Sequence, residues 1–189
     1  MPTIISGTNG VDNIQDGLIT PTDLNTSVNP AVQRIQTFPA QASTAGTSID
    51  FTGIPSWAKE ITVMFNGVST NGTSVVQVQL GTSTGFTVSG YVSASAEQAG
   101  TVVGTGAITS GIGLDNIGAA TYSRSLNLMI TNISTNNYIA SYSGIQATNR
   151  TIYGGGNVTL PATLDRIRIT TVNGTDTFDA GSINILVKG

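Results

Sequence analysis

The chain has 189 residues, enough for one globular domain with an extension, and a net charge of −3. Only 9% of its residues are charged, and its seven Lys and Arg are scattered, which excludes a basic stripe for phosphate and therefore a nucleic-acid partner. Thr, Ser, Asn and Gly contribute 29, 18, 15 and 23 residues, a composition that favours strands and turns over helices.

The chain contains neither histidine nor cysteine. Ser-His-Asp and Cys-His nucleophiles, disulfides and nearly all transition-metal sites are therefore excluded. We expect a protein that is not an enzyme, with no catalytic residue, no metal site and no cofactor. The N-terminal sequence has no basic region followed by a long apolar run, so we expect synthesis in a cytoplasm, without a signal peptide or membrane insertion.

Residues 1–36 are expected to form an extended arm. No aromatic residue precedes Phe38, and turn signals recur at 6–10, 16–17 and 29–30. The short apolar pieces of this segment are too small to bury themselves. We therefore expect the arm to become ordered only against another surface, and residues 37–189 to form the folded domain.

From Ile49 onward, strand-length apolar runs alternate with Gly, Asn and Ser clusters. Strands are expected at 61–65, 75–80, 85–94, 107–114, 125–132, 138–142, 157–160, 166–172 and 182–187. Their number and spacing predict an all-β fold, an antiparallel β-sandwich similar to a jelly roll. Gly-rich steps at 104–106, 111–113 and 154–156 do not open a helix, so we interpret them as loops and not as phosphate cradles.

Apolar residues alternate with other residues along the later strands, so each strand has one strongly apolar face. The residues expected to face the core are Leu126, Leu128, Ile130, Ile167, Ile169, Ile183, Ile185 and Val187. Met129 and Leu186 make the opposite face semi-apolar, which predicts that a neighbouring subunit or the other sheet covers it. Arg166 and Arg168 are expected on a solvated face, within reach of Asp165 or a neighbouring subunit.

Carboxylates are the remaining candidates for catalysis. A glycosidase needs two of them facing each other across a cleft, and Asp176 and Asp179 are the pair closest in sequence beyond the arm. Their setting, residues 175–181, is typical of a turn in which Asp side chains accept hydrogen bonds from N–H groups. We expect such a turn between the last two strands, rather than a catalytic pair or a calcium site.

The aromatic residues are the candidates for contact with a surface ligand. Trp57 precedes a strand, and we expect it to cover one end of the sandwich. The residues proposed for contact with a glycan are Tyr91, Tyr122, Tyr138, Tyr142 and Tyr153. A half-buried ring with its hydroxyl at the surface is the competing interpretation for each of them.

Two segments resemble a known family. Residues 51–69, FTGIPSWAKEITVMFNGVS, are similar to the opening of the β-sandwich domain in tailed-bacteriophage fibre, head-fibre and related virion proteins. Residues 164–185, LDRIRITTVNGTDTFDAGSINI, are similar to the closing hairpin of that domain. The segment between them, residues 70–163, matches less clearly.

This resemblance implies a virion structural protein that is assembled in the host cytoplasm and forms a homotrimer. It further implies an arm that binds other virion proteins and a distal knob. As a tail fibre or head fibre, the knob would bind a glycan or protein of the host surface. The alternative is a capsid decoration or connector protein without a receptor, and a small polysaccharide depolymerase is a third hypothesis.

Overall fold

The computed structural model describes residues 34–147 and 149–189. The chain divides into two units, Met1–Gln33 and Arg34–Gly189, and the second unit is the folded domain. Most of the predicted arm, residues 1–33, lies outside the described residues. The predicted boundary after residue 36 falls inside the first strand, β1 (Ile35–Thr37), so the folded domain begins at Arg34.

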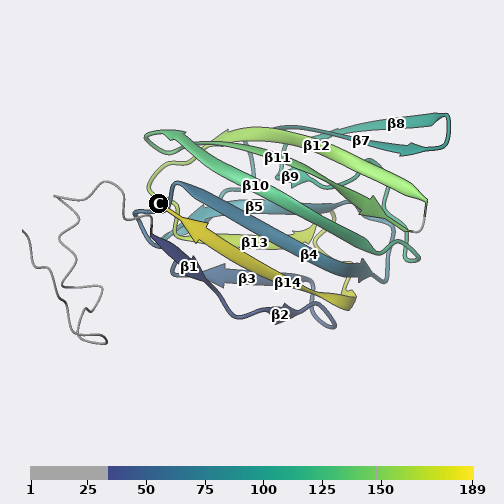
Figure 1. Cartoon of the computed structure of the whole chain (residues 1–189), viewed down its shortest axis with the longest axis horizontal. Helices are drawn as coiled ribbons and strands as arrows, with labels where there is room; N and C mark the ends of the chain where they lie inside the picture. The colour runs from purple at the N-terminus through teal and green to yellow at the C-terminus, as the bar shows by residue number, and fades with distance from the viewer. Residues whose placement is uncertain (1–33, 148) are drawn as a thin grey trace, which may run out of the picture. The chain divides into compact units, whose positions relative to one another are not determined.

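Two antiparallel sheets build the domain, which confirms the predicted all-β sandwich (Figure 1). The described residues contain no helix, and so none that could span a membrane. The larger sheet has nine strands, of which β2 (Gln41–Ala42) pairs with β14 beside β1. The others follow in the order β1, β14 (Phe178–Lys188), β4 (Glu60–Thr70), β10 (Arg124–Ser134), β11 (Asn137–Gln146), β12 (Arg150–Thr159), β7 (Val92–Ala99) and β8 (Val102–Ile108).

The smaller sheet has five strands and lies behind the larger one in Figure 1. Its order is β3 (Ser48–Thr52), β13 (Arg166–Thr171), β5 (Val76–Thr82) and β6 (Gly85–Phe86), and β9 (Ile112–Gly113) also pairs with β5. The predicted strands at 85–94 and 107–114 are therefore each divided between the two sheets. Residues near the middle of each form the connection that crosses from one sheet to the other.

The core is the apolar layer between the sheets. Val63, Leu128, Ile167, Ile169 and Ile185 are all 0% exposed, and the other residues predicted to face the core are also buried. Burying one such side chain contributes about 1.5–3 kcal/mol. The predicted alternation is thus confirmed, with Met129 on the opposite face and 46% exposed.

The last two strands do not form the hairpin that the resemblance implied. β13 pairs with β3 and β5 in the smaller sheet, whereas β14 pairs with β4 in the larger one. The turn between them is confirmed, and it is tied to the β4–β5 connection because Asp176 accepts a hydrogen bond from the Ser74 N–H (2.9 Å). The apolar faces of β13 and β14 meet across the core, which is why both strands show the same alternation.

Two of the three Gly-rich steps predicted as loops lie inside strands. Residues 104–106 belong to β8 and residues 154–156 to β12, while β9 holds two residues of the third step. A Cβ on Gly156 would lie 2.4 Å from the Val92 carbonyl oxygen and 2.9 Å from Ile112 Cδ1. These glycines therefore let adjacent strands of the domain approach closely, and they do not interrupt their own strand.

Trp57 lies half-buried against the core, as predicted for a residue that covers one end of the sandwich. The Arg34 guanidinium lies 5.9 Å from the centroid of its ring, and Gly189 at the chain's end packs against it. The tryptophan thus joins the first and last described residues.

The strand register can be tested by comparing Ile169→Ala with Arg168→Ala. Ile169 is fully buried, so its truncation should lower the free energy of unfolding by about 2–5 kcal/mol. The side chain of Arg168 is 34% exposed and pairs with Asp50, so its loss should cost about 1 kcal/mol or less. Urea denaturation of both variants measures the contrast, and equal losses would contradict this register.

Candidate functional site

Three of the five tyrosines proposed for surface contact belong to the core. Tyr91, Tyr138 and Tyr142 are only 2–6% exposed, which places them out of reach of a surface ligand. The Tyr91 hydroxyl is used inside the domain, where it accepts a hydrogen bond from the Leu80 N–H (2.7 Å). The prediction failed for these residues because Tyr138 and Tyr142 take inward positions on β11 and Tyr91, just before β7, turns its ring into the core.

The two other tyrosines remain accessible to different degrees. The half-buried ring of Tyr122 packs under the Arg150 guanidinium, 5.0 Å from the ring centroid. Tyr153 lies on β12 and is 44% exposed. Of the proposed contact residues, Tyr153 therefore keeps the largest open aromatic surface.

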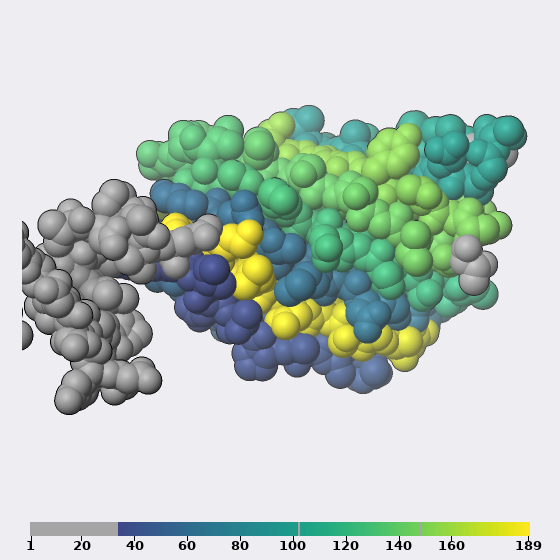
Figure 2. Space-filling view, in the orientation of Figure 1, coloured from purple at the N-terminus to yellow at the C-terminus, as the bar shows by residue number. Residues whose placement is uncertain are grey.

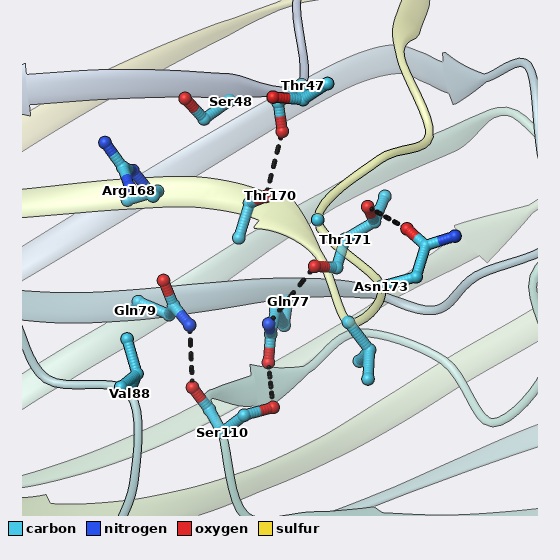
Figure 3. Close-up of a pocket in the computed structure, with 12 residues that line it drawn as sticks. Thr47, Ser48, Gln77, Gln79, Val88, Ser110, Arg168, Thr170, Thr171 and Asn173 are labelled. Carbon is cyan, nitrogen blue, oxygen red and sulfur yellow. Dashed lines mark hydrogen bonds between the residues drawn. The ribbon is translucent and has the colours of Figure 1, made fainter.

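A polar hollow of about 320 Å³ lies on the outer side of the smaller sheet (Figure 3). Gln77 and Gln79 of β5 form part of its lining and are nearly buried. Ser110 holds both amides, because its hydroxyl donates to Gln77 Oε1 (2.7 Å) and its carbonyl accepts from Gln79 Nε2 (2.9 Å). The hollow is therefore built by side chains with fixed orientations.

Arg168 is the one charged residue that lines this hollow. Its guanidinium makes two hydrogen bonds to the Asp50 carboxylate (2.8 and 2.7 Å) and lies 4.1 Å from the centroid of the Phe86 ring. Hydroxyls and amides make up most of the remaining polar lining. Such a surface can hydrogen-bond a polar ligand, but no carboxylate lines it to act as an acid or base.

Five neighbouring strands of the larger sheet have their charged residues on the inner side. On strands β7, β8, β10, β11 and β12 the charged residues are Glu97, Arg124 and Arg150, and the strand registers place all three on the face turned to the protein interior. Exposed sheet faces of soluble proteins normally show the opposite distribution. The outward residues of these five strands, which we call the uncharged face, therefore form the most unusual surface of the domain.

The uncharged face is turned toward the viewer in Figure 1 and Figure 2. Its large apolar side chains are 44–67% exposed. Between them lie two hollows of about 280 and 390 Å³, the first lined by Ala94, Ala96 and Tyr153 among others, and the second by Met129 and its neighbours. The exposed apolar residues are Val92 on β7, Val103 on β8, Met129 on β10, Ile139 and Ile145 on β11, and Tyr153 on β12.

The sequence predicted two residues of this face. Met129 was recognised because its strand alternates clearly, and Tyr153 was proposed for surface contact. The Gly-rich parts of β8 and β12 were interpreted as loops, and most of β7 was not assigned as a strand. The alternation of Val92, Ala94 and Ala96 with the buried Ser93 and Ser95 is the signal that identifies β7. It was missed because the inward residues there are polar.

The inward charges form a buried network. Arg124 and Asp115 have fully buried side chains, and the Arg124 Nε donates to Asp115 Oδ2 (2.5 Å). Gln146 Nε2 donates to the same oxygen (3.0 Å), and Arg150 pairs with Glu97 (2.6 Å). Burial raises the pKa of Asp115 to about 6, because desolvation outweighs the opposing effect of Arg124.

The carboxylates considered for catalysis are used in the turn. Asp176 accepts hydrogen bonds from the Ser74 N–H and from Asn173 Nδ2, which lower its pKa, and Asp179 accepts one from the Ser69 hydroxyl. The described residues contain no group of three or more acidic side chains that could hold a metal ion. Each Asp therefore fixes backbone or side-chain donors near the turn.

The pH dependence of unfolding should report the buried Asp115. Its pKa rises from 3.8 to about 6 on folding, so between about pH 4 and 6 the native state holds a proton that the unfolded state releases. The free energy of unfolding of the wild type, relative to Asp115→Asn, should therefore fall as the pH rises through this window. Urea denaturation of both proteins at several pH values measures this difference. A difference that grows with pH would show that Arg124, and not burial, dominates.

Comparison of the chain with models of protein families, with curated proteins and with solved structures finds no match.

Proposed function

We propose that this chain is a structural protein of a tailed-bacteriophage particle, a fibre whose residues 34–189 form a self-associating knob. The observation that carries the proposal is the uncharged face of the larger sheet. The two segments that resemble phage fibre domains support the same class of protein. They lie in β3–β4 and in β13–β14, and these strands are neighbours within each sheet, β3 beside β13 and β14 beside β4.

The uncharged face has the composition of a surface that is covered in an assembly. Its six large apolar side chains lie on five neighbouring strands, and none of the outward residues on these strands is charged. Monomeric proteins rarely expose large continuous apolar patches, and the cores of interfaces are depleted of charge. Removal of each square ångström of apolar surface from water contributes about 25 cal/mol, before the cost of association.

A second copy of the chain is the partner that we propose for this face. The exposed Met129, Ile139 and Ile145 are projections on β10 and β11, and the hollow beside Tyr153 has a floor of small residues on β7 and β8. Projections and hollow on one surface allow copies to pack around a closed symmetry axis. A homotrimer is the assembly that the resemblance implies.

The smaller sheet carries the surface that we propose for contact with the host. The polar hollow of the smaller sheet lies on the side opposite the uncharged face, where assembly leaves it open to a glycan or protein. The burial of Tyr91, Tyr138 and Tyr142 favours the alternative, a capsid decoration or connector protein without a receptor. Purified protein that neither binds host cells nor blocks phage adsorption would support this alternative.

A charge on the uncharged face should dissociate the assembly. Met129→Glu places a carboxylate within the proposed interface, where burial without a partner is costly, so the dissociation constant should rise about tenfold or more. Sedimentation velocity measures the loss of trimer, and the wild type should sediment well above the 19.3 kDa of one chain.

The matched control for this experiment is Val88→Glu, which adds the same charge beside the polar hollow, at a residue that is 61% exposed. It should leave the oligomer and the melting temperature unchanged. A wild-type protein that is monomeric at micromolar concentration would refute self-association, and equal effects of both variants would refute the location of the interface.

Deletion of residues 1–33 should leave a folded domain that no longer enters virions. The fourteen strands and the core that the structure describes lie within residues 34–189, so the shortened chain should keep its cooperative melting. Particles from phage that carry the deletion should lack the protein by mass spectrometry. Normal incorporation would contradict attachment through the arm.

A further inference from the structure

One region of the interior concentrates polar atoms that have no hydrogen-bond partner. Among the described residues, seven buried side-chain atoms lack a partner, and six of them belong to the network around Asp115. Buried polar groups are nearly always paired, and each exception needs an explanation. The six are Glu97 Oε2, Asp115 Oδ1, Asn116 Oδ1, Arg124 Nη2, Tyr142 Oη and Gln146 Oε1.

These residues lie together in space. Asp115 joins Arg124 and Gln146 by direct hydrogen bonds, and its backbone carbonyl accepts from the Ser95 hydroxyl of β7 (2.7 Å). Glu97 and Asn116 both approach the inner side of Gly104, where an added Cβ would lie 3.4 Å from Glu97 Cγ and 2.3 Å from Asn116 Nδ2.

Tyr142 belongs to the same group, because its hydroxyl lies beside Ser95 of β7: a Cβ on Gly154 would lie 2.7 Å from Tyr142 Oη and 2.9 Å from Ser95 Cα. The neighbouring strands β10, β11, β12 and β7 form one side of the region. The segment 114–123, which we call the covering loop, contributes Asp115 and Asn116 to it. Gln146 Nε2 also donates to the Ile117 carbonyl of this loop (3.2 Å).

We propose that this enclosed polar region is a binding site for internal water, occupied by at least two molecules. Four of the six atoms are carboxylate or amide oxygens, which can only accept; Arg124 Nη2 can only donate, and the Tyr142 hydroxyl can do both. Two water molecules donate four hydrogen bonds, one to each oxygen, and accept from Arg124 and Tyr142. Each water then makes three hydrogen bonds, which is the usual number for buried water in proteins.

A metal cation fits this site less well than water. Arg124 and Arg150 already pair with Asp115 and Glu97, so the ionised side chains have no net charge for a cation to neutralise. A cation beside the buried Arg124 would also be repelled, and it would leave the Arg124 N–H donor without a partner. Water alone supplies both donors and acceptors.

A high-resolution crystal structure of the full chain tests the proposal directly. Two or more ordered waters should bridge the six atoms, and the melting temperature should be the same in millimolar calcium chloride and in EDTA. A dry interior would overturn the proposal. In that case the six polar atoms would pair directly with other side chains, for example after rotation of the Asn116 amide. Calcium at the site, with a higher melting temperature in calcium chloride, would also overturn it.

Tyr142→Phe, with Tyr138→Phe as control, tests the individual contacts. Both rings are 6% exposed, and each variant removes only one hydroxyl. In crystals of Tyr142→Phe the water that this hydroxyl contacts should be displaced or weakly ordered. The Tyr138 hydroxyl interacts with Leu164 and Asn132 instead, so Tyr138→Phe should keep both waters. Unchanged waters in both variants would contradict the proposed role of Tyr142.

Discussion

Apolar contact between the two sheets is the interaction on which the whole domain depends. The chain has no cysteine for a disulfide, and few of its residues are charged, so packing must supply most of the stability. β13 lies inside the smaller sheet, between β3 and β5, and its Ile167 and Ile169 are fully buried against the larger sheet. The buried face of β13 is therefore part of the contact on which the domain depends.

The smaller sheet does not cover all of the larger one. The β7–β8 hairpin projects at the upper right of Figure 1, and of the smaller sheet only the short β9 lies close to it. Beyond β9, the covering loop lies against the inner face of the larger sheet in place of the smaller sheet. The buried side chains of β7 that face it are polar, namely Ser93, Ser95 and Glu97. Charged groups in such a place must be paired because isolated buried charges are very costly. The Asp115–Arg124 pair is thus a consequence of where the second sheet ends.

The sequence predicted which residues face the core wherever apolar and polar residues alternate clearly along a strand. The β10, β13 and β14 registers were correct because isoleucine and leucine mark one face of each strand. β12 was mostly missed, since Gly154, Gly155 and Gly156 were interpreted as a loop although close approach of neighbouring strands requires them. Partner strands also cannot be read from local sequence, so β13 and β14 were expected to form a hairpin although they lie in different sheets.

The candidate surface was less predictable than the fold, for a related reason. Tyrosine was taken as a mark of exposure, yet Tyr91 and Tyr142 occupy inward positions, and the unusual feature of the exposed face is the charge that it lacks. The lack of charge on the outer face can be recognised only after the strand registers place Glu97, Arg124 and Arg150 on the inner face.

The distribution of charge on β7, β8, β10, β11 and β12 also argues against a solvated role for the uncharged face. Sheet proteins that stay monomeric protect their exposed strands with lysine, proline or irregular pairing. β8 is the edge strand on this side, and its seven residues, VVGTGAI, include no charge and no proline. The other edge is interrupted, because β1 and β2 have only three and two residues with Pro39 between them. The protein therefore protects the edge formed by β1 and β2 and leaves the uncharged face and its edge strand open, which is the arrangement that the proposed self-association requires.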